Sequence, residues 1–136
     1  MIIAIDFDGT CVTHMYPEVG ENIGAEYVLK ALAEEGHILV LNTMRSREEL
    51  KDAENWFKEH NIPLYGVNKT PGQENWTTSP KVYAELYIDD SALGCPVKSR
   101  RPFVDWVTVA EMLVKEGILS SDKFEKIMPS IIDEIK

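Results

Sequence analysis

The stretch that decides the fold is residues 2–10, Ile-Ile-Ala-Ile-Asp-Phe-Asp-Gly-Thr, near the start of a chain of 136 residues. Its four apolar residues favour a short buried strand, on which side chains alternate between the two faces of a sheet. Two carboxylates, Asp6 and Asp8, then follow one residue apart. Clustered carboxylates repel one another and raise each other's pKa, so they need a stabilising partner. A divalent cation that prefers hard oxygen ligands, such as Mg²⁺, is one such partner.

Three later segments supply parts that match this acid pair. Residues 40–43 are an apolar run that ends in a hydroxyl, and residues 86–90 are an apolar run that ends in two acids. Lys81 lies between these runs and can neutralise an anionic group. In chain order the set is Asp-x-Asp-Gly-Thr, apolar-Thr, Lys and apolar-Asp-Asp.

This ordered set resembles the motifs of the haloacid dehalogenase superfamily of phosphohydrolases. The resemblance implies an α/β fold with a three-layer Rossmann-like core around a central parallel sheet. It also implies Mg²⁺-dependent hydrolysis of phosphate monoesters. Superfamily members often carry a cap domain after the first motif or between the second and third. Both intervals are too short for one here, so we expect a single domain over residues 1–136 with no separate cap.

The resemblance gives each matched residue an expected role. Asp6 is the expected nucleophile, which would form an aspartyl-phosphate, and Asp8 is the expected general acid and base. Thr43 and the backbone N–H of Met44 are expected to bind a phosphate oxygen, and Lys81 is expected to neutralise the phosphate charge. The expected metal ligands are Asp6, the backbone carbonyl of Asp8, and Asp89. Asp90 is expected either to bind the metal through a water molecule or to orient Lys81.

Two lysines compete for the phosphate-site role. Only residues 82–88 separate Lys81 from Asp89, too few for a helix and a strand. In many superfamily members the lysine opens a helix before the last motif strand, but the short interval here is similar to that of the deoxyribonucleotidase branch. Lys69 lies on the same predicted loop and remains the alternative.

The rest of the chain alternates between strand and helix patterns. The predicted strands are residues 2–6, 37–42, 63–67 and 85–89. The predicted helices are residues 25–35, 46–60, 104–115 and 121–136, the last kinked or interrupted at Pro129. Ser46 is expected to cap the second helix, with Glu49 completing a capping box. This alternation predicts a parallel sheet whose ligands bind at the carboxyl ends of its strands, where all the candidate acids lie.

For the other polar residues near the motifs we expect solvated or structural roles rather than catalytic ones. Arg45 and Arg47 are predicted to be solvated residues at the start of a helix, with contact between one of them and the substrate as the alternative. His14 is predicted to be an exposed or structural loop residue. The pair Arg100 and Arg101 is predicted to lie on a solvated loop, with an acidic substrate tail or a partner subunit as the alternative contacts.

Composition limits the partners. The net charge of −9 argues against binding of nucleic acid by a basic surface, although a phosphorylated end still fits a local pocket. The expected substrate is a small phosphorylated molecule such as a nucleotide or a sugar phosphate, and a homo-oligomer could close an uncapped site. No apolar run approaches the roughly 20 residues of a membrane helix, and no signal peptide is visible, so a cytoplasmic protein is expected. Cys11 and Cys95 form no paired metal motif and are expected to be reduced thiols.

Two other functions fit part of the pattern. A phosphotransferase would use Asp6 and Asp8 in the same way but pass the phosphoryl group to an alcohol. A phosphoryl-sensing module of the receiver type needs an acceptor aspartate at the end of a middle strand. Asp52 instead lies in a run with helical periodicity, residues 48–59, so the phosphatase is the leading hypothesis.

Overall fold

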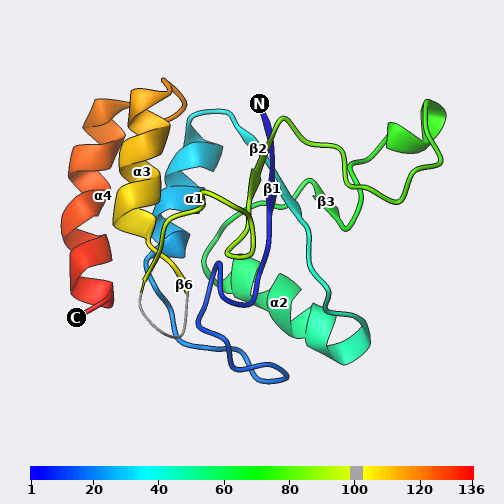
Figure 1. Cartoon of the computed structure of the whole chain (residues 1–136), viewed down its shortest axis with the longest axis horizontal. Helices are drawn as coiled ribbons and strands as arrows, with labels where there is room; N and C mark the ends of the chain where they lie inside the picture. Colours follow the sequence, from blue (N-terminus) through cyan, green and yellow to red (C-terminus); the bar gives the residue numbers. More distant parts are fainter. Residues whose placement is uncertain (99–102) are drawn as a thin grey trace.

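The structure is a computed structural model in which residues 1–98 and 103–136 are described (Figure 1). Arg100 and Arg101 lie outside the described residues. The strands are β1 (Ile2–Ile5), β2 (Ile38–Leu41), β3 (Gly66–Val67), β4 (Leu86–Ile88), β5 (Val97–Lys98) and β6 (Phe103–Val104). The helices are α1 (Ala25–Glu34), α2 (Arg47–Glu59), the short 3₁₀ helix η1 (Gln73–Asn75), α3 (Trp106–Lys115) and α4 (Ser121–Glu134).

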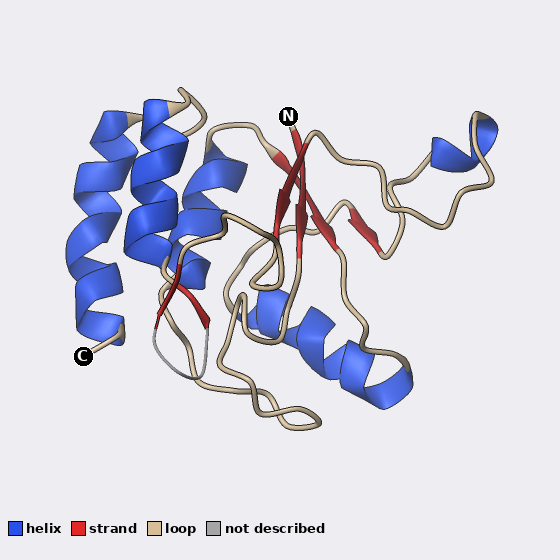
Figure 2. Cartoon of the chain, viewed as in Figure 1, coloured by secondary structure: helices blue, strands red, loops and turns tan. Residues whose placement is uncertain are grey.

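The central sheet has four parallel strands in the order β3-β2-β1-β4, and β5 and β6 form a separate two-stranded antiparallel sheet. Within the central sheet Ile3 of β1 pairs with Leu39 of β2 and with Leu86 of β4. Parallel neighbours need a crossover connection, which α1 supplies between β1 and β2 and α2 supplies between β2 and β3. The predicted α/β class with a central parallel sheet flanked by helices, a Rossmann-like core, is therefore confirmed (Figure 2).

The two faces of the sheet are covered differently. Ile3 and Ile5 belong to a large hydrophobic cluster to which all four α-helices contribute buried residues. Ala4 points to the opposite face, because side chains alternate along a strand, and it packs in a small cluster with Val82. Ala84 packs against that small cluster as well. The third layer is thus an irregular segment, residues 68–85, and in Figure 1 its tip extends away from α1, α3 and α4.

Two aromatic residues anchor the loop that follows β1. Phe7 is fully buried, and its ring centroid lies 5.8 Å from that of Trp56 and 6.3 Å from that of Phe57, both on α2. Trp106 of α3 donates its indole N–H to the carbonyl oxygen of Thr10 over 2.7 Å. The loop that carries the first acid pair is therefore held by α2 and α3 at once.

Several details differ from the sequence predictions. Ser46 is the N-cap of α2, but its side chain makes no capping hydrogen bond, so the predicted capping box is wrong. Arg47, the next residue, has a φ of 53°, in the left-handed region. The chain therefore enters the helix with a backbone conformation that differs from that of an ordinary capped start. Helix α3 begins at Trp106 because Asp105 caps it, and α4 continues through Pro129 without interruption.

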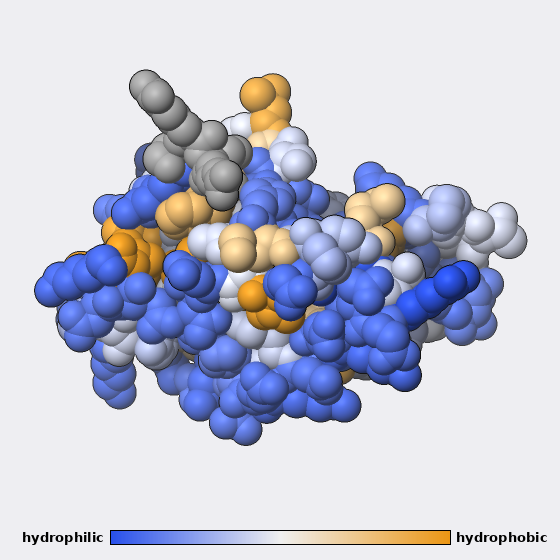
Figure 3. Space-filling model, turned by 90° about the horizontal axis from the view of Figure 1, so that it is seen from below, coloured by the Kyte–Doolittle hydropathy of each residue, from blue (hydrophilic) through white to orange (hydrophobic). Residues whose placement is uncertain are grey.

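Among the described residues, no helix combines the length and the apolar character that crossing a bilayer requires. Figure 3 views the molecule from the side on which the strands of the central sheet end. This face is mostly hydrophilic, and its hydrophobic residues form small separate groups. The candidate acids lie on this side of the sheet.

The different burial of two isoleucines gives a first test of this packing. Ile5 of β1 is fully buried, whereas Ile38 of β2 is 39% exposed. Ile5→Val should lower the free energy of unfolding by about 0.5–1.5 kcal/mol, because it removes a methylene from a packed core. The same change at Ile38 should stay within about 0.5 kcal/mol of the parent. Urea unfolding with an unchanged m-value measures both, and equal losses would contradict the assigned faces of the sheet.

Candidate metal and catalytic site

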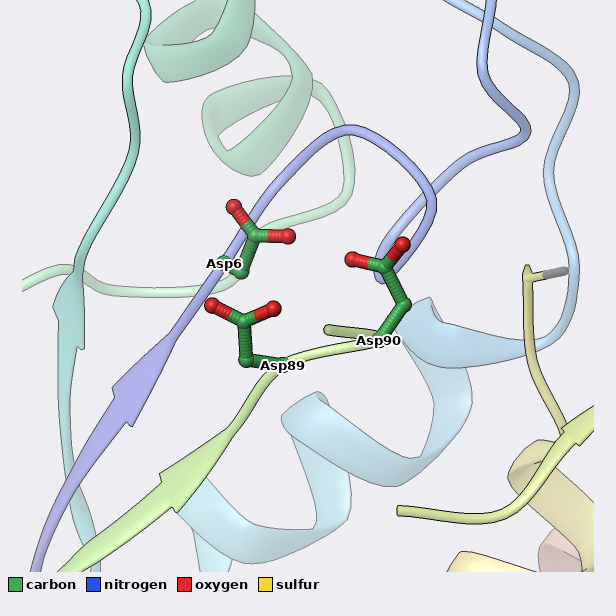
Figure 4. Close-up of side chains that lie close together, drawn as sticks. All are labelled: Asp6, Asp89 and Asp90. Atoms are coloured by element: carbon green, nitrogen blue, oxygen red, sulfur yellow. The ribbon is translucent and has the colours of Figure 1, made fainter. Parts of the chain in front are cut away.

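Three carboxylates meet where β1 and β4 end. Asp6 follows β1, and Asp89 and Asp90 follow β4, so the parallel pairing of these strands brings the three residues to one edge. One oxygen from each carboxylate lies within 4.8 Å of the others, and Figure 4 shows the three side chains grouped at this edge. Carboxylate oxygens are the ligands that Mg²⁺ prefers, so the donor set fits this cation.

Thr10 ties two of these carboxylates together. Its hydroxyl lies 2.9 Å from Oδ2 of Asp6 and 3.1 Å from Oδ1 of Asp90, and it accepts the Asp90 N–H over 3.0 Å. Because a hydroxyl has a single hydrogen, Thr10 can donate to only one of the two carboxylates at a time. Thr10 therefore positions the acids without neutralising their repulsion.

Gly9 is required by the close packing of this turn. Its φ is 79°, in the left-handed region that favours glycine. A Cβ at this position would overlap Nε2 of His14 and Oδ2 of Asp90. The glycine of the Asp-x-Asp-Gly-Thr motif thus allows His14 and Asp90 to lie directly over the turn.

The electrostatics of the group favour a bound cation. Burial, the hydrogen bond with Asp90 and the charge of Asp89 together raise the pKa of Asp6 to about 8. Burial also acts to raise the pKa of Asp90, but hydrogen bonds with Asp6, His14 and Thr10 outweigh it and lower that pKa. Without a cation, the raised pKa of Asp6 therefore favours a proton on this carboxyl. A divalent cation would take the place of that proton and relieve the repulsion.

Asp8 points to a different partner. Arg45 donates its Nε–H to Oδ2 of Asp8 over 2.7 Å and an Nη2–H to Oδ1 over 2.8 Å. The Asp8 side chain is not part of the three-carboxylate group. Arg45 is only 2% exposed, so the prediction of a solvated arginine is wrong at this position, although Arg47 is exposed as expected. A buried guanidinium needs a counter-charge, and the partly buried Asp8 of the motif supplies it, which explains why Arg45 turns inward.

Arg45 also holds the loop that follows the first motif. It donates to the carbonyl oxygens of Pro17 (3.2 Å), Glu18 (2.7 Å) and Glu49 (3.1 Å). Its Cζ lies 5.1 Å from the ring centroid of Tyr16. One side chain therefore joins Asp8, residues 16–18 and the first turn of α2.

A cavity of about 570 Å³ opens above these groups. Its volume lies within the usual range of small-molecule sites. Every predicted site residue except Lys81 lines it, namely Asp6, Asp8, Thr43, Met44, Asp89 and Asp90. The cavity is also lined by four residues that are not among the predicted site residues, namely His14, Tyr16, Arg45 and Ser91.

Thr43 and Met44 keep hydrogen-bond donors available. The Thr43 N–H donates to Oδ1 of Asn68 over 2.8 Å, and the Thr43 hydroxyl oxygen accepts the Arg45 N–H over 3.1 Å. The hydroxyl hydrogen of Thr43 remains free to be donated elsewhere. Within the described part of the chain, no hydrogen bond uses the Met44 N–H. Both donors lie beside the cavity, as an anion site requires.

The structure brings neither candidate lysine to this cavity. The ammonium of Lys81 lies 5.4 Å from the ring centroid of Tyr87, and that of Lys69 lies 3.2 Å from a carboxylate oxygen of Glu74. Neither residue lines the cavity, where Arg45 and His14 carry the basic groups. The compressed interval between Lys81 and Asp89 gave no means of seeing this difference, because a loop of that length has many conformations.

Two further residues near the acids have clear partners. His14 lies 2.8 Å from Oδ2 of Asp90 through its Nε2, so it contacts the acid group rather than solvent alone. Cys11 is fully buried, and its thiol lies 3.4 Å from the carbonyl oxygen of Asp6. Burial raises the pKa of the Cys11 thiol, which keeps it protonated. Cys11 and Cys95 are both free, as the sequence predicted.

Comparison with known proteins identifies a relative of known structure but no named activity. No family model matches the chain, and no curated protein matches it. A conserved protein from Bacteroides thetaiotaomicron has a solved structure that superposes with a TM-score of 0.73 at 38% sequence identity. The match covers 85% of this chain and 91% of that protein. At this identity and coverage, the chain belongs to the same family as this conserved Bacteroides protein.

Proposed function

We propose that the protein is a Mg²⁺-dependent phosphatase of the haloacid dehalogenase type, which hydrolyses phosphate monoesters through an aspartyl-phosphate on Asp6. The observation that carries the proposal is the joint placement of acids and anion-binding donors around one cavity. Asp6, Asp89 and Asp90 stand at the ends of β1 and β4, and Thr43 and Met44 follow the neighbouring strand β2.

The metal would be held by the carboxylates of Asp6, Asp89 and Asp90, which offer hard oxygen ligands within 4.8 Å of one another. The backbone carbonyl of Asp8 is the further ligand that the superfamily resemblance implies. When bound, Mg²⁺ supplies positive charge that screens the phosphate from the surrounding carboxylates. The raised pKa of Asp6 supports this assignment, because burial, the hydrogen bond with Asp90 and the charge of Asp89 all disfavour the ionised carboxylate unless a cation is bound.

Asp6 would attack the phosphorus atom with one carboxylate oxygen. The new bond joins Asp6 to phosphorus as the bond from phosphorus to the leaving oxygen breaks, and the leaving oxygen takes a proton from Asp8. A water molecule then attacks the phosphorus of the aspartyl-phosphate, gives its proton to Asp8 and releases the Asp6 carboxylate with inorganic phosphate. The hydrogen bond from Thr10 keeps Asp6 in one orientation for both steps.

Arg45 would act as a positioning residue for Asp8. Its two hydrogen bonds fix the plane of the Asp8 carboxyl group, whose side chain is 18% exposed and lines the cavity. Each carboxylate oxygen has more than one lone pair, so a lone pair remains for proton exchange with the leaving group. A fixed proton donor near the leaving oxygen is what general acid catalysis requires.

The phosphate would bind on the other side of the site. The hydroxyl of Thr43 and the N–H of Met44 provide neutral donors there, and no lysine lines the cavity within the described residues. The metal would then supply most of the positive charge near the phosphate, because the charge of Arg45 is paired with Asp8. This arrangement suits a small monoester better than a polyphosphate, whose extra charge would meet the acids of the site.

The first test is metal-dependent turnover. Phosphate release from a panel of monoesters should need Mg²⁺ and stop with EDTA. Asp6→Asn should lower kcat by several orders of magnitude, because an amide is a poor nucleophile. Asp52→Asn changes an exposed acid on α2 and should leave kcat unchanged. Turnover by Asp6→Asn at the parental rate, or full activity in EDTA after the metal content is shown to be nil, would refute the proposal.

The second test uses stability and pH in the absence of metal. The pKa of Asp6 is about 8 in the folded protein, against 3.8 for an ordinary aspartate. A carboxyl whose folded pKa is raised contributes stability that is lost as pH rises toward that pKa. The amide in Asp6→Asn can make the hydrogen bonds of the protonated acid but does not ionise, so it does not lose this stability as the pH rises. The stability of Asp6→Asn relative to the parent should therefore increase from pH 5 to pH 8.

Thermal unfolding in EDTA at both pH values measures this difference. The lowered pKa of Asp90 acts below the ordinary value of 3.8 and so lies outside this pH window. Asp52→Asn is the control, and its stability should parallel that of the parent. Mg²⁺ should stabilise the parent more at pH 8 than at pH 5 and should stabilise Asp6→Asn less. A flat difference between parent and Asp6→Asn would show that Asp6 is not held among other acids.

The third test concerns Arg45. Lysine cannot make the paired hydrogen bonds that the guanidinium makes with Asp8, so Arg45→Lys should lower kcat about tenfold or more and destabilise the protein. Arg47→Lys, two residues away and exposed, should change neither property. Steady-state kinetics and urea unfolding measure the effects. Parental kcat in Arg45→Lys would show that catalysis does not depend on the orientation of Asp8.

A further inference from the structure

Tyr16 is an exposed aromatic residue in a fixed position. It is 60% exposed, it lines the cavity above the acids, and Arg45 lies against its ring with Cζ 5.1 Å from the centroid. The stacked guanidinium covers part of the ring, and the high exposure leaves the remainder accessible. Large exposed aromatic surface at a cavity is a common feature of recognition sites.

The backbone on both sides of Tyr16 is held in place. His14 lies 2.8 Å from Asp90 through its ring nitrogen. The carbonyl oxygens of Pro17 and Glu18 accept hydrogen bonds from Arg45 over 3.2 Å and 2.7 Å. A ring held in this way loses little conformational freedom when it contacts a ligand, which favours binding.

Tyr16 lies on the leaving-group side of the site. Asp8, the proposed proton donor to the leaving oxygen, contacts Arg45, and Arg45 stacks on Tyr16. Asp8 and Tyr16 both lie on the segment that follows β1, whereas the phosphate donors Thr43 and Met44 follow β2. A leaving alcohol whose oxygen is next to Asp8 therefore extends along the wall that Arg45 and Tyr16 form.

This wall offers an aromatic surface rather than free charge. Every N–H of the Arg45 guanidinium already donates to Asp8 or to a backbone carbonyl, so none is left for a substrate. The side chain of Met44, which is almost completely exposed, adds an apolar group to the same cavity. The surrounding face is mostly hydrophilic, and its hydrophobic residues form small separate groups rather than one broad apolar patch (Figure 3).

We propose that Tyr16 determines specificity, and that it selects phosphate monoesters whose leaving alcohol carries a planar aromatic ring, which stacks on the tyrosine. This inference rests on the proposed phosphatase function and adds the substrate class. The phosphate binds beside Thr43, the leaving oxygen lies at Asp8, and the ring of the alcohol lies on Tyr16.

A matched pair of substrates tests the inference. Benzyl phosphate and cyclohexylmethyl phosphate both release a primary alcohol of similar size, but only the first carries a planar ring. The parent should favour benzyl phosphate in kcat/KM by about twofold to tenfold, the range expected for one aromatic pair. Tyr16→Phe should keep this preference, whereas Tyr16→Leu should bring the ratio close to one. Tyr65→Leu, which alters a 52% exposed tyrosine outside the cavity, should leave the ratio unchanged.

Binding of the matching phosphonates, which have no hydrolysable ester, separates the inference from the proposed function. Calorimetry with Mg²⁺ should show that the parent binds benzylphosphonate more tightly than cyclohexylmethylphosphonate, and that Tyr16→Leu loses the difference. This pattern without turnover of either ester would uphold the inference and refute the phosphatase. Turnover with a ratio near one in the parent, a ratio that survives in Tyr16→Leu, or no phosphonate binding by the parent would each overturn the role of Tyr16.

Discussion

The pairing of β1 with β4 is the constraint on which the site depends, because it forces like charges together. Parallel strands end at the same edge, so Asp6 on one strand and Asp89 and Asp90 on the other cannot move apart without breaking the sheet. The hydrophobic core around Ile3 and Ile5 stabilises the sheet enough to tolerate this repulsion. The folded protein thereby brings carboxylates together at a place where a cation can neutralise their charge. The acids carry this charge, and the backbone geometry concentrates it.

Arg45 is the second point of organisation, and it acts through the opposite principle. Among the described residues no basic side chain pairs with Asp6 or Asp89, whereas Asp8 has a counter-charge that is fully buried and fully hydrogen-bonded. A single motif thus places two carboxylates, one residue apart, in contrasting environments. In the metal-free protein Asp6 is the carboxyl with the raised pKa and Asp8 is the one paired with an arginine, so the proposed roles of nucleophile and proton donor require the cation to hold Asp6 ionised.

The sequence predicted what depends on local pattern and on order along the chain. The alternation of apolar runs and helical segments predicted the parallel sheet, and the predicted strands 2–6 and 85–89 led us to expect four acids at one edge. Three of those carboxylates gather there, whereas the Asp8 side chain contacts Arg45. The sequence did not predict contacts that depend on the direction of a polar side chain near the surface. Arg45 resembled any arginine at a helix start, and only the fold shows that it faces Asp8. Lys81 fitted the motif order, yet the conformation of its loop directs it to Tyr87. The need of Asp8 for a counter-charge was the one signal in the sequence that could have indicated the inward position of Arg45.

The unequal covering of the sheet has a consequence for how this family can diversify. The helical face is one continuous core, so a change of length in α1, α2, α3 or α4 disturbs many partners at once. In the part of the chain that the structure describes, the opposite face has only the small cluster around Val82, and the segment between β3 and β4 is held by the buried Thr70 and Gln73 but ends in an exposed tip, residues 74–80. Chain length can therefore change within this tip at small cost to the fold. Relatives can therefore gain or lose residues there while the acids, which are fixed by the pairing of β1 with β4, keep their geometry.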